Sequence, residues 1–166
     1  GGELKTFEEV RKAIDLGMYR VTIGSSMISE TELMKRVIAE FGSSKIALGF
    51  IIPAKEKEAA ERAAVSASLQ AKELGIKRVM YTDVIHEGPV QFPNYDMIGE
   101  FGKQTGMRVT VIGGISGLEG LLRLQELEPC GVDSVVIGRA MYENKFSCQG
   151  MWRLSEEGNY PYTAKV

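Results

Sequence analysis

Short, almost continuously apolar segments alternate with amphipathic helical stretches along the chain. A nearly unbroken apolar run is typical of a strand buried on both faces of a parallel sheet. Strict alternation of such strands with helices predicts an α/β fold with parallel strands. The predicted strands are 20–24 (RVTIG), 45–52 (KIALGFII), 77–82 (KRVMYT), 107–112 (MRVTVI) and 133–138 (DSVVIG). The predicted helices are 6–16, 29–41, 54–74, 95–105 and 118–127.

Glycine residues mark the expected ends of four of these helices. Gly17, Gly42, Gly75 and Gly106 stand where a helix C-cap is expected. The length of 166 residues suits one domain with a real core. We therefore interpret residues 1–166 as a single domain.

Composition and charge narrow the classes of partner. The net charge is −2 and the basic residues are scattered, so neither nucleic acid nor a membrane is an expected partner. No apolar run approaches the roughly 18 residues that a membrane span needs.

Cys130 and Cys148 are interpreted as reduced thiols of a cytoplasmic protein. With His86 as the only histidine, they do not form a zinc-binding set.

An internal repeat carries the first functional signal. Residues 2–8 (GELKTFE) resemble residues 113–119 (GGISGLE), and residues 17–27 (GMYRVTIGSSM) resemble residues 131–141 (GVDSVVIGRAM). Each copy contains a strand end with glycine, a helix, a Gly turn, an apolar strand and an Ile-Gly pair. We call residues 2–27 the first module and residues 113–141 the second module.

Such modules are suited to phosphate. Glycine lets a backbone approach a ligand closely, and the free N–H groups that open a helix attract anions. Glycines that only form tight βα turns are the alternative. The predicted phosphate-binding residues are Gly2, Gly24 and Ser25 in the first module and Gly113, Gly114, Ser116, Gly138 and Arg139 in the second.

The spacing of the modules predicts where they lie. They are about four βα units apart, so an eight-fold barrel would place them on opposite sides of its mouth, one for each end of a ligand with two phosphates. Glu3 brings negative charge to the first module, so the second is expected to bind phosphate first.

Residues 82–88 (TDVIHEG) form the segment richest in side chains that could take part in catalysis. A hydroxyl, two carboxylates and the imidazole of His86 follow a predicted strand, where barrel enzymes place catalytic groups. Two alternatives remain open: Asp83 as a structural anchor of the loop, and His86 as an exposed or supporting histidine.

With these motifs the chain resembles the histidine-biosynthesis barrels, most closely the ProFAR isomerases. The likeness covers roughly residues 1–150 and rests on Thr82-Asp83, Gly113-Gly114-Ile115-Ser116 and residues 136–146 (VIGRAMYENKF). It implies a C-terminal portion, about five strands, of a TIM-type (β/α)8 barrel. It also implies an Amadori aldose–ketose isomerisation of a bisphosphorylated substrate, with no metal or organic cofactor. Thr82, Asp83 and Glu87 are the catalytic residues that the resemblance suggests.

One departure from the family is chemical. Ile51 stands where the family has an acid, and isoleucine cannot transfer a proton. The family's first two strands, with nearly all of the third, have no counterpart. We therefore expect no isomerase activity from this chain alone. Three hypotheses remain: a ProFAR-isomerase-like enzyme, a degenerate phosphate-binding barrel without catalysis, and a cyclase-like relative.

An open five-stranded sheet also predicts association. Its two edges would present unpaired backbone groups. We expect self-association or a complementing N-terminal segment. The side chains expected to face the barrel interior and lose their cover are Val21, Ile23, Val79, Val109, Val111, Val135 and Ile137.

Overall fold

The structure is a computed structural model that describes residues 4–53, 55–83, 93–143, 145, 147, 149–150 and 152. The predictions for Gly2, Glu3, His86 and Glu87 lie outside the described residues. The strands are β1 Val21–Gly24, β2 Ile46–Ile52, β3 Arg78–Asp83, β4 Arg108–Ile112 and β5 Val132–Val136. The α-helices are α1 Phe7–Asp15, α2 Thr31–Phe41, α3 Lys57–Glu73, α4 Tyr95–Thr105, α5 Leu118–Gln125 and α6 Arg139–Tyr142. The 3-10 helices are η1 Ser25–Ser29, η2 Ser43–Lys45 and η3 Glu128–Cys130.

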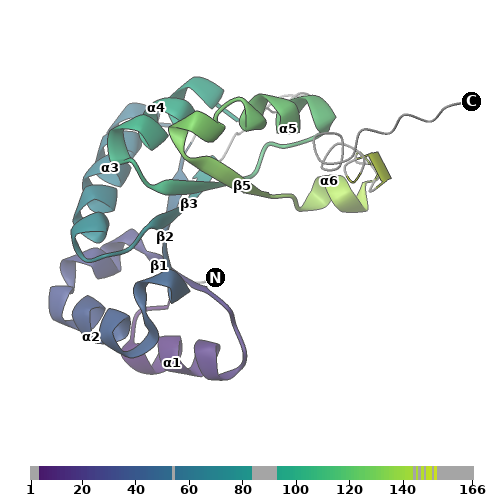
Figure 1. Ribbon diagram of the computed structural model, residues 1–166. Helices are drawn as coiled ribbons and strands as arrows, with labels where there is room; N and C mark the ends of the chain where they lie inside the picture. Colours follow the sequence, from purple (N-terminus) through teal and green to yellow (C-terminus); the bar gives the residue numbers. More distant parts are fainter. Residues whose placement is uncertain are drawn as a thin grey trace, which may run out of the picture.

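The five strands form one sheet in the order β1-β2-β3-β4-β5, and every neighbouring pair is parallel. A helix separates each strand from the next, so the expected α/β alternation and parallel sheet are confirmed. The fold is that of a partial (β/α) barrel (Figure 1). Leu4 forms a parallel bridge to Ile23 on the outer side of β1, which places the first module's opening at that edge.

The helix ends follow the local sequence. Gly17, Gly42, Gly75 and Gly106 all have positive φ angles at or directly after a helix C-terminus, as expected for glycine C-caps. Of the helices that the structure describes, none is long and apolar enough to cross a membrane.

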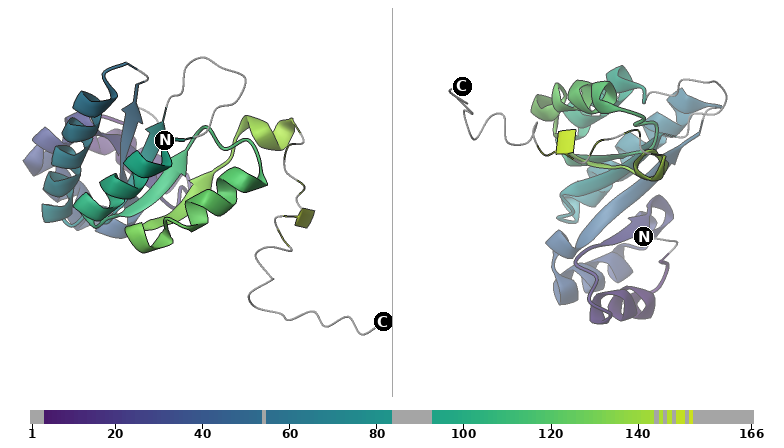
Figure 2. Two further views of the ribbon diagram at one scale, coloured as in Figure 1. Left: turned by 90° about the horizontal axis from the view of Figure 1, so that it is seen from above. Right: turned by 90° about the vertical axis from the view of Figure 1, so that its right-hand side faces the viewer.

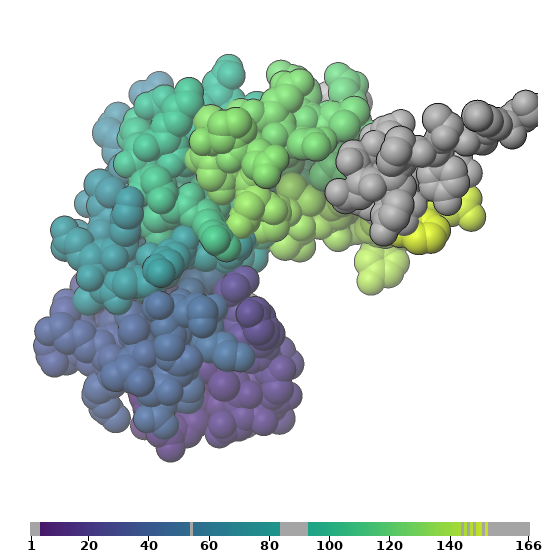
Figure 3. Space-filling view, in the orientation of Figure 1, coloured from purple at the N-terminus to yellow at the C-terminus, as the bar shows by residue number. Residues whose placement is uncertain are grey.

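Among the described residues, helices cover one face of the sheet. Figures 1 and 2 show helices α3, α4 and α5 along the outer side of the curved sheet, and Figure 3 shows the molecule hollowed on the inner side. Along each strand, successive side chains point to opposite faces. One set packs with the helices in the core, and the other set lies on the uncovered face.

This division corrects one expectation. Val21, Ile23, Val79, Val109 and Val111 are at most 2% exposed and belong to the core shared with the helices. They therefore do not face the barrel interior, and they keep their cover in the open sheet. Val135 and Ile137 also pack against this core. The error arose because a continuous apolar run does not tell which alternate residues face the helices.

The uncovered face instead carries two cross-strand rows of mixed chemistry. The lower row is Gly49, Met80, Thr110 and Ser134, which the strand register places side by side. The upper row, nearer the carboxyl ends of the strands, is Ile51, Thr82, Ile112 and Val136.

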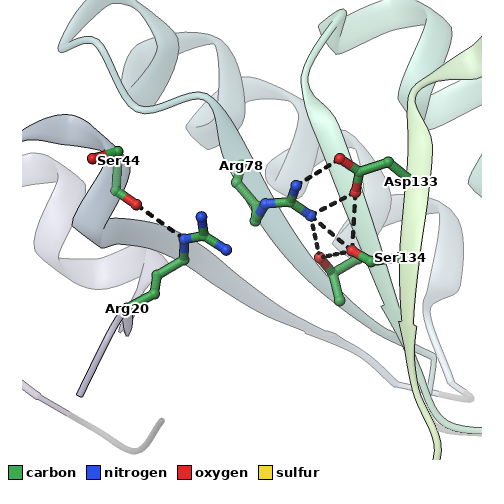
Figure 4. Close-up of polar contacts among 6 residues, drawn as sticks. Arg20, Ser44, Arg78, Asp133 and Ser134 are labelled. Carbon is green, nitrogen blue, oxygen red and sulfur yellow. Dashed lines mark hydrogen bonds and ion pairs between the residues drawn. The ribbon is translucent and has the colours of Figure 1, made fainter. Parts of the chain in front are cut away.

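A charged cluster lies at the amino-terminal end of this face (Figure 4). Arg78 donates to both carboxylate oxygens of Asp133 at 2.6 Å, to Thr110 Oγ1 at 2.7 Å and to Ser134 Oγ at 2.8 Å. The register shifts between Val109 and Thr110, which leaves Asp133 as an extra residue in β5. This β-bulge lets two successive side chains, Asp133 and Ser134, reach the same guanidinium.

The cluster also sets the protonation of Asp133. Burial by itself would raise the pKa of the carboxyl, but hydrogen bonds from Arg78 and Ser134 outweigh it, so the pKa lies below its ordinary value. Because its pKa is lowered, the ionised Asp133 carboxylate contributes to the stability of the fold. This contribution is fully present above the ordinary Asp pKa and is lost as the pH falls through the lowered pKa. The cluster thus fixes β5, an edge strand, on β3 and β4.

Candidate functional site at the carboxyl ends of the strands

Thr82 lies on the uncovered face, near the carboxyl end of β3. In the strand register it stands between Ile51 of β2 and Ile112 of β4, and Val136 of β5 follows. Ile51 is 71% exposed and Val136 is 43% exposed, so this part of the face is open. Within the upper row, Thr82 is the only polar side chain.

Ile51 occupies the position where the resemblance to the isomerase family predicts an acid. The register places it directly beside Thr82, on the same face. A carboxylate at position 51 would therefore share the site with the threonine hydroxyl. In this chain the position supplies an aliphatic side chain instead.

Asp83 points the other way, toward the helices. Its side chain is only 2% exposed. Lys57 Nζ, at the start of α3, lies 3.1 Å from Asp83 Oδ1, and the backbone N–H of Asn94 donates to Asp83 Oδ2 at 2.9 Å. Asn94 is the N-cap of α4, with its side chain accepting from the Met97 N–H. Asp83 therefore joins the end of β3 to the starts of two helices, which favours the anchoring role over the catalytic one.

The groups near Asp83 form a charged region on the helix side of the sheet. Burial raises the pKa of Glu61, and the charges of Glu100 and Asp83 raise it further, against the opposing effect of Lys57. Burial also raises the pKa of Tyr81 well above its ordinary value, and the charges of Glu61 and Asp83 add to this. Tyr81 is thus a neutral core residue at physiological pH, packed edge-on against Phe101.

The loop after β4 is shaped by glycine. Gly113 and Gly114 have φ angles of 93° and 70°, in the left-handed region that favours glycine. A Cβ at Gly113 would lie 3.1 Å from the Asp83 carbonyl oxygen, so this loop runs close to the end of β3. Ser116 follows in the same loop, half-buried. The loop therefore brings the predicted Gly113, Gly114 and Ser116 to the end of the sheet that carries Thr82.

The loop after β5 adds Gly138 and Arg139, which are both exposed. Gly138 is the N-cap of α6, and a Cβ built on it would meet nothing within 4 Å. Because β4 and β5 are neighbours, the structure brings the described residues of the second module to one corner of the sheet.

The first module lies at the opposite edge of the sheet. Gly24 ends β1, and the exposed Ser25 opens η1. The strand order therefore separates Gly24 and Ser25 from Gly138 and Arg139 by the full width of the sheet.

The two modules differ in how the backbone N–H groups are occupied at the starts of α1 and α5, the helices that follow their glycine loops. In α1 the N–H groups of Lys5 and Thr6 donate to Glu9 Oε2 at 2.7 and 3.0 Å, and Thr6 Oγ1 accepts from the Glu9 N–H. These backbone hydrogen bonds lower the pKa of Glu9, so it carries its charge at neutral pH. In the part of the chain that the structure describes, no side chain caps α5, which begins after Gly117.

At α1 an anion would thus compete with Glu9 for backbone N–H groups, whereas among the described contacts of α5 the acidic residue of the first turn, Glu119, makes no capping hydrogen bond. Glu9 was not predicted from the sequence, although Thr6-x-x-Glu9 is a recognisable capping-box signature. Lys57 and Asn94 were not predicted either, because their roles depend on contacts between residues distant in sequence. Within the described ranges, no three His, Cys, Asp or Glu side chains come together to hold a metal ion.

We predict that Lys57→Met lowers the free energy of unfolding by about 2–3 kcal/mol, because it removes the cation that lies 3.1 Å from the buried Asp83 carboxylate and leaves, among the described residues, the backbone N–H of Asn94 as its partner. The matched control is Lys35→Met. Its ion pair with Glu32 joins side chains that are 60% and 86% exposed, so we expect a change within about 0.5 kcal/mol. Urea unfolding measures both variants, and equal losses would contradict the anchoring role of Asp83.

Comparison with known proteins is consistent with these features. The family of histidine biosynthesis proteins matches residues 1–147. A phosphoribosyl imidazole-4-carboxamide isomerase of Chlorobium phaeobacteroides (strain BS1) is 40% identical over 159 residues, which cover 92% of this chain and 61% of the relative. The isomerases of the same name from Prosthecochloris aestuarii and Chloroherpeton thalassium are 37% and 35% identical over 95% of this chain, and 63% and 62% of their own lengths are covered.

The chain thus spans a little over three fifths of the length of these curated relatives. The family match over residues 1–147 agrees with the observed fold, which has a parallel sheet with glycine loops at its carboxyl end. This chain belongs to the family of histidine biosynthesis proteins.

Proposed function

We propose that this chain binds the phosphorylated substrate of a ProFAR-type aldose–ketose isomerisation in histidine biosynthesis. The observation that carries the proposal is the meeting of the Gly113-Gly114 loop, the exposed Gly138 and the hydroxyl of Thr82 at one end of the sheet. The isomerase names of the curated relatives support the reaction class. Thr82 would contact the reacting part of the substrate, and the second module would hold a phosphate.

The contacts at the start of α1 support the second module as the stronger phosphate site. Glu3 lies outside the described residues, whereas Glu9 occupies backbone N–H groups before α1. The positive φ angles of Gly113 and Gly114 allow a close approach of the backbone to a ligand. Arg139 adds a cation on the neighbouring loop.

We predict that Gly138→Asp weakens the binding of inorganic phosphate at least about tenfold, because it adds a negative charge where the anion would sit. Gly24→Asp is the matched control in the first module. At both positions the φ angle is negative and a new Cβ meets no atom closer than 3.7 Å, so both variants should fold. Isothermal titration calorimetry gives the affinities. If Gly24→Asp weakens binding as much as Gly138→Asp, the second module is not the preferred site.

Catalysis by this chain alone is not expected. The upper row offers the hydroxyl of Thr82 but an aliphatic Ile51 in place of an acid, and each acid or base role is worth about 10²–10⁴ in rate. We predict no detectable conversion of the aminoaldose substrate in an absorbance assay. If the chain converts the substrate steadily and Thr82→Val abolishes the conversion, proton transfer takes place without an acid at position 51.

The exposed side chain of Ile51 also favours a second candidate, a binding protein that holds a phosphorylated ligand without reacting. Steady conversion of the aminoaldose substrate in the absorbance assay would exclude this candidate, whereas phosphate binding without conversion would agree with it. The cyclase-like alternative would also use a carboxylate on the strand that carries Ile51, and no specific observation favours it.

The edge of β5 supports a proposal about assembly. In the order of the described strands, β5 has a neighbour on one side only, while Leu4 bridges to β1 at the other edge. Unpaired backbone groups on β5 can pair with another chain or with a complementing N-terminal segment.

We predict that sedimentation at low micromolar concentration shows species heavier than the 18.2 kDa monomer. The core valines keep their cover, so this association is expected from the unpaired backbone groups at the edge and not from exposure of those valines. A compact 18.2 kDa monomer that unfolds cooperatively would contradict the proposal.

A further inference from the structure

Side chains from three strands meet at one arginine on the uncovered face (Figure 4). Arg78 on β3 donates to Thr110 on β4 at 2.7 Å and to Ser134 on β5 at 2.8 Å. Its two terminal nitrogens also bind both carboxylate oxygens of Asp133 at 2.6 Å. Thr110 Oγ1 and Ser134 Oγ are themselves hydrogen-bonded at 2.7 Å. Arg78 therefore connects β5 to a strand that is not its neighbour in the sheet.

Less backbone pairing holds β5 than holds the strands inside the sheet. Among the described strands it pairs with β4 alone, and the extra residue Asp133 interrupts the ladder. A β-bulge bends the strand that contains it and increases the local twist. The direction in which β5 leaves the bulge therefore depends on what holds the bulge in place. Asp133 and Ser134, the two residues at the bulge, both accept hydrogen bonds from Arg78.

We propose that Arg78 and Asp133 are positioning residues for the phosphate site of the second module. By fixing the bulge, they set where Gly138 and Arg139 lie relative to the Gly113-Gly114 loop. The inference rests on the proposed function, because it takes the phosphate to be held by these two loops. It goes further by assigning a role in binding to side chains at the opposite end of the strand.

The length of β5 makes the site sensitive to a small change at the bulge. Ser134 and Gly138 are four residues apart, which is about 13 Å of extended chain. A change of about 10° in the direction of β5 would move Gly138 by about 2 Å. Backbone N–H groups bind an oxygen only at about 2.7–3.2 Å, so a shift of this size would break contacts with the anion. Gly113 and Gly114 would not follow the shift, because they come after β4, which is paired on both sides.

A direct effect of charge on the anion predicts the opposite result for one variant. If the Asp133 carboxylate acted on phosphate through its charge, its removal would strengthen binding. If Asp133 acts by fixing the bulge, its removal weakens binding. The distance of about 13 Å also exceeds the Debye length of about 8 Å at physiological salt, so the direct effect of the charge should be small. Weaker binding in Asp133→Ala would therefore indicate a change of position.

The test measures the affinity of the whole chain for inorganic phosphate by isothermal titration calorimetry. We expect Arg78→Met and Asp133→Ala each to weaken binding about tenfold, because the donors of the two loops no longer converge on one anion. Arg108→Met is the matched control, since the register places Arg108 directly beside Arg78 and the variant loses the same charge. Among the described residues, the exposed Arg108 side chain makes none of the hydrogen bonds to Asp133, so we expect a change within about twofold.

A second measurement separates positioning from a general loss of stability. The amide NMR resonances of Gly138 and Arg139, recorded without phosphate, should shift in Arg78→Met and Asp133→Ala but not in Arg108→Met. Circular dichroism shows whether each variant is folded at the temperature of the measurement. The side chain of Asp133 is 33% exposed, so Asp133→Ala should fold even if Arg78→Met does not.

The outcomes distinguish this inference from the proposed function. If the unmodified chain binds phosphate and Asp133→Ala binds it equally or more tightly, the inference is overturned and the phosphate site stands. Equal weakening in Arg108→Met and Arg78→Met would likewise overturn the inference, because charge alone would then explain the loss. Unchanged resonances of Gly138 and Arg139 in folded Asp133→Ala would do the same. If the unmodified chain does not bind phosphate, both the inference and the proposed phosphate site fail.

Discussion

One-sided burial of a parallel sheet is the constraint on which the rest of this structure depends. Helices cover one face, so alternate residues of every strand enter the shared core and the residues between them reach the uncovered face. The core side is made of large aliphatic side chains such as Ile23, Leu48 and Val109. The residues on the uncovered side differ from strand to strand, and the proposed site lies on this side at the carboxyl ends.

Because of this constraint, the consecutive residues Thr82 and Asp83 have different environments. They follow each other in β3, so one side chain must face the open side and the other the helices. Lys57 and the backbone N–H of Asn94 both bind the Asp83 carboxylate, so the starts of α3 and α4 are held at the end of the strand. Thr82 is thereby supported by a buried neighbour and stays available to a ligand.

The uncovered face is polar at one end and aliphatic at the other. At the amino-terminal end, a β-bulge in β5 turns Asp133 and Ser134 toward Arg78, and this cluster secures the edge strand. At the carboxyl end, Ile51 and Ile112 flank Thr82, close to the Gly113-Gly114 loop. The polar cluster stabilises the sheet at the amino-terminal end, and the carboxyl end is the region where we propose that a ligand binds.

The sequence by itself determined the elements: all five strands and the helices between them, because apolar runs, amphipathic stretches and glycine ends are local signals. The internal repeat predicted that the glycine modules lie on opposite sides of a barrel mouth, and the strand order places their described residues at opposite edges of the sheet. Only the tertiary structure decided which face each strand residue occupies. It moved Val21 and Val79 from the expected barrel interior to the core, and it gave Asp83 its partners Lys57 and Asn94. The physical reason is that a continuous apolar run has no visible period of two, and that the partner of a buried charge is set by packing between residues far apart in the chain.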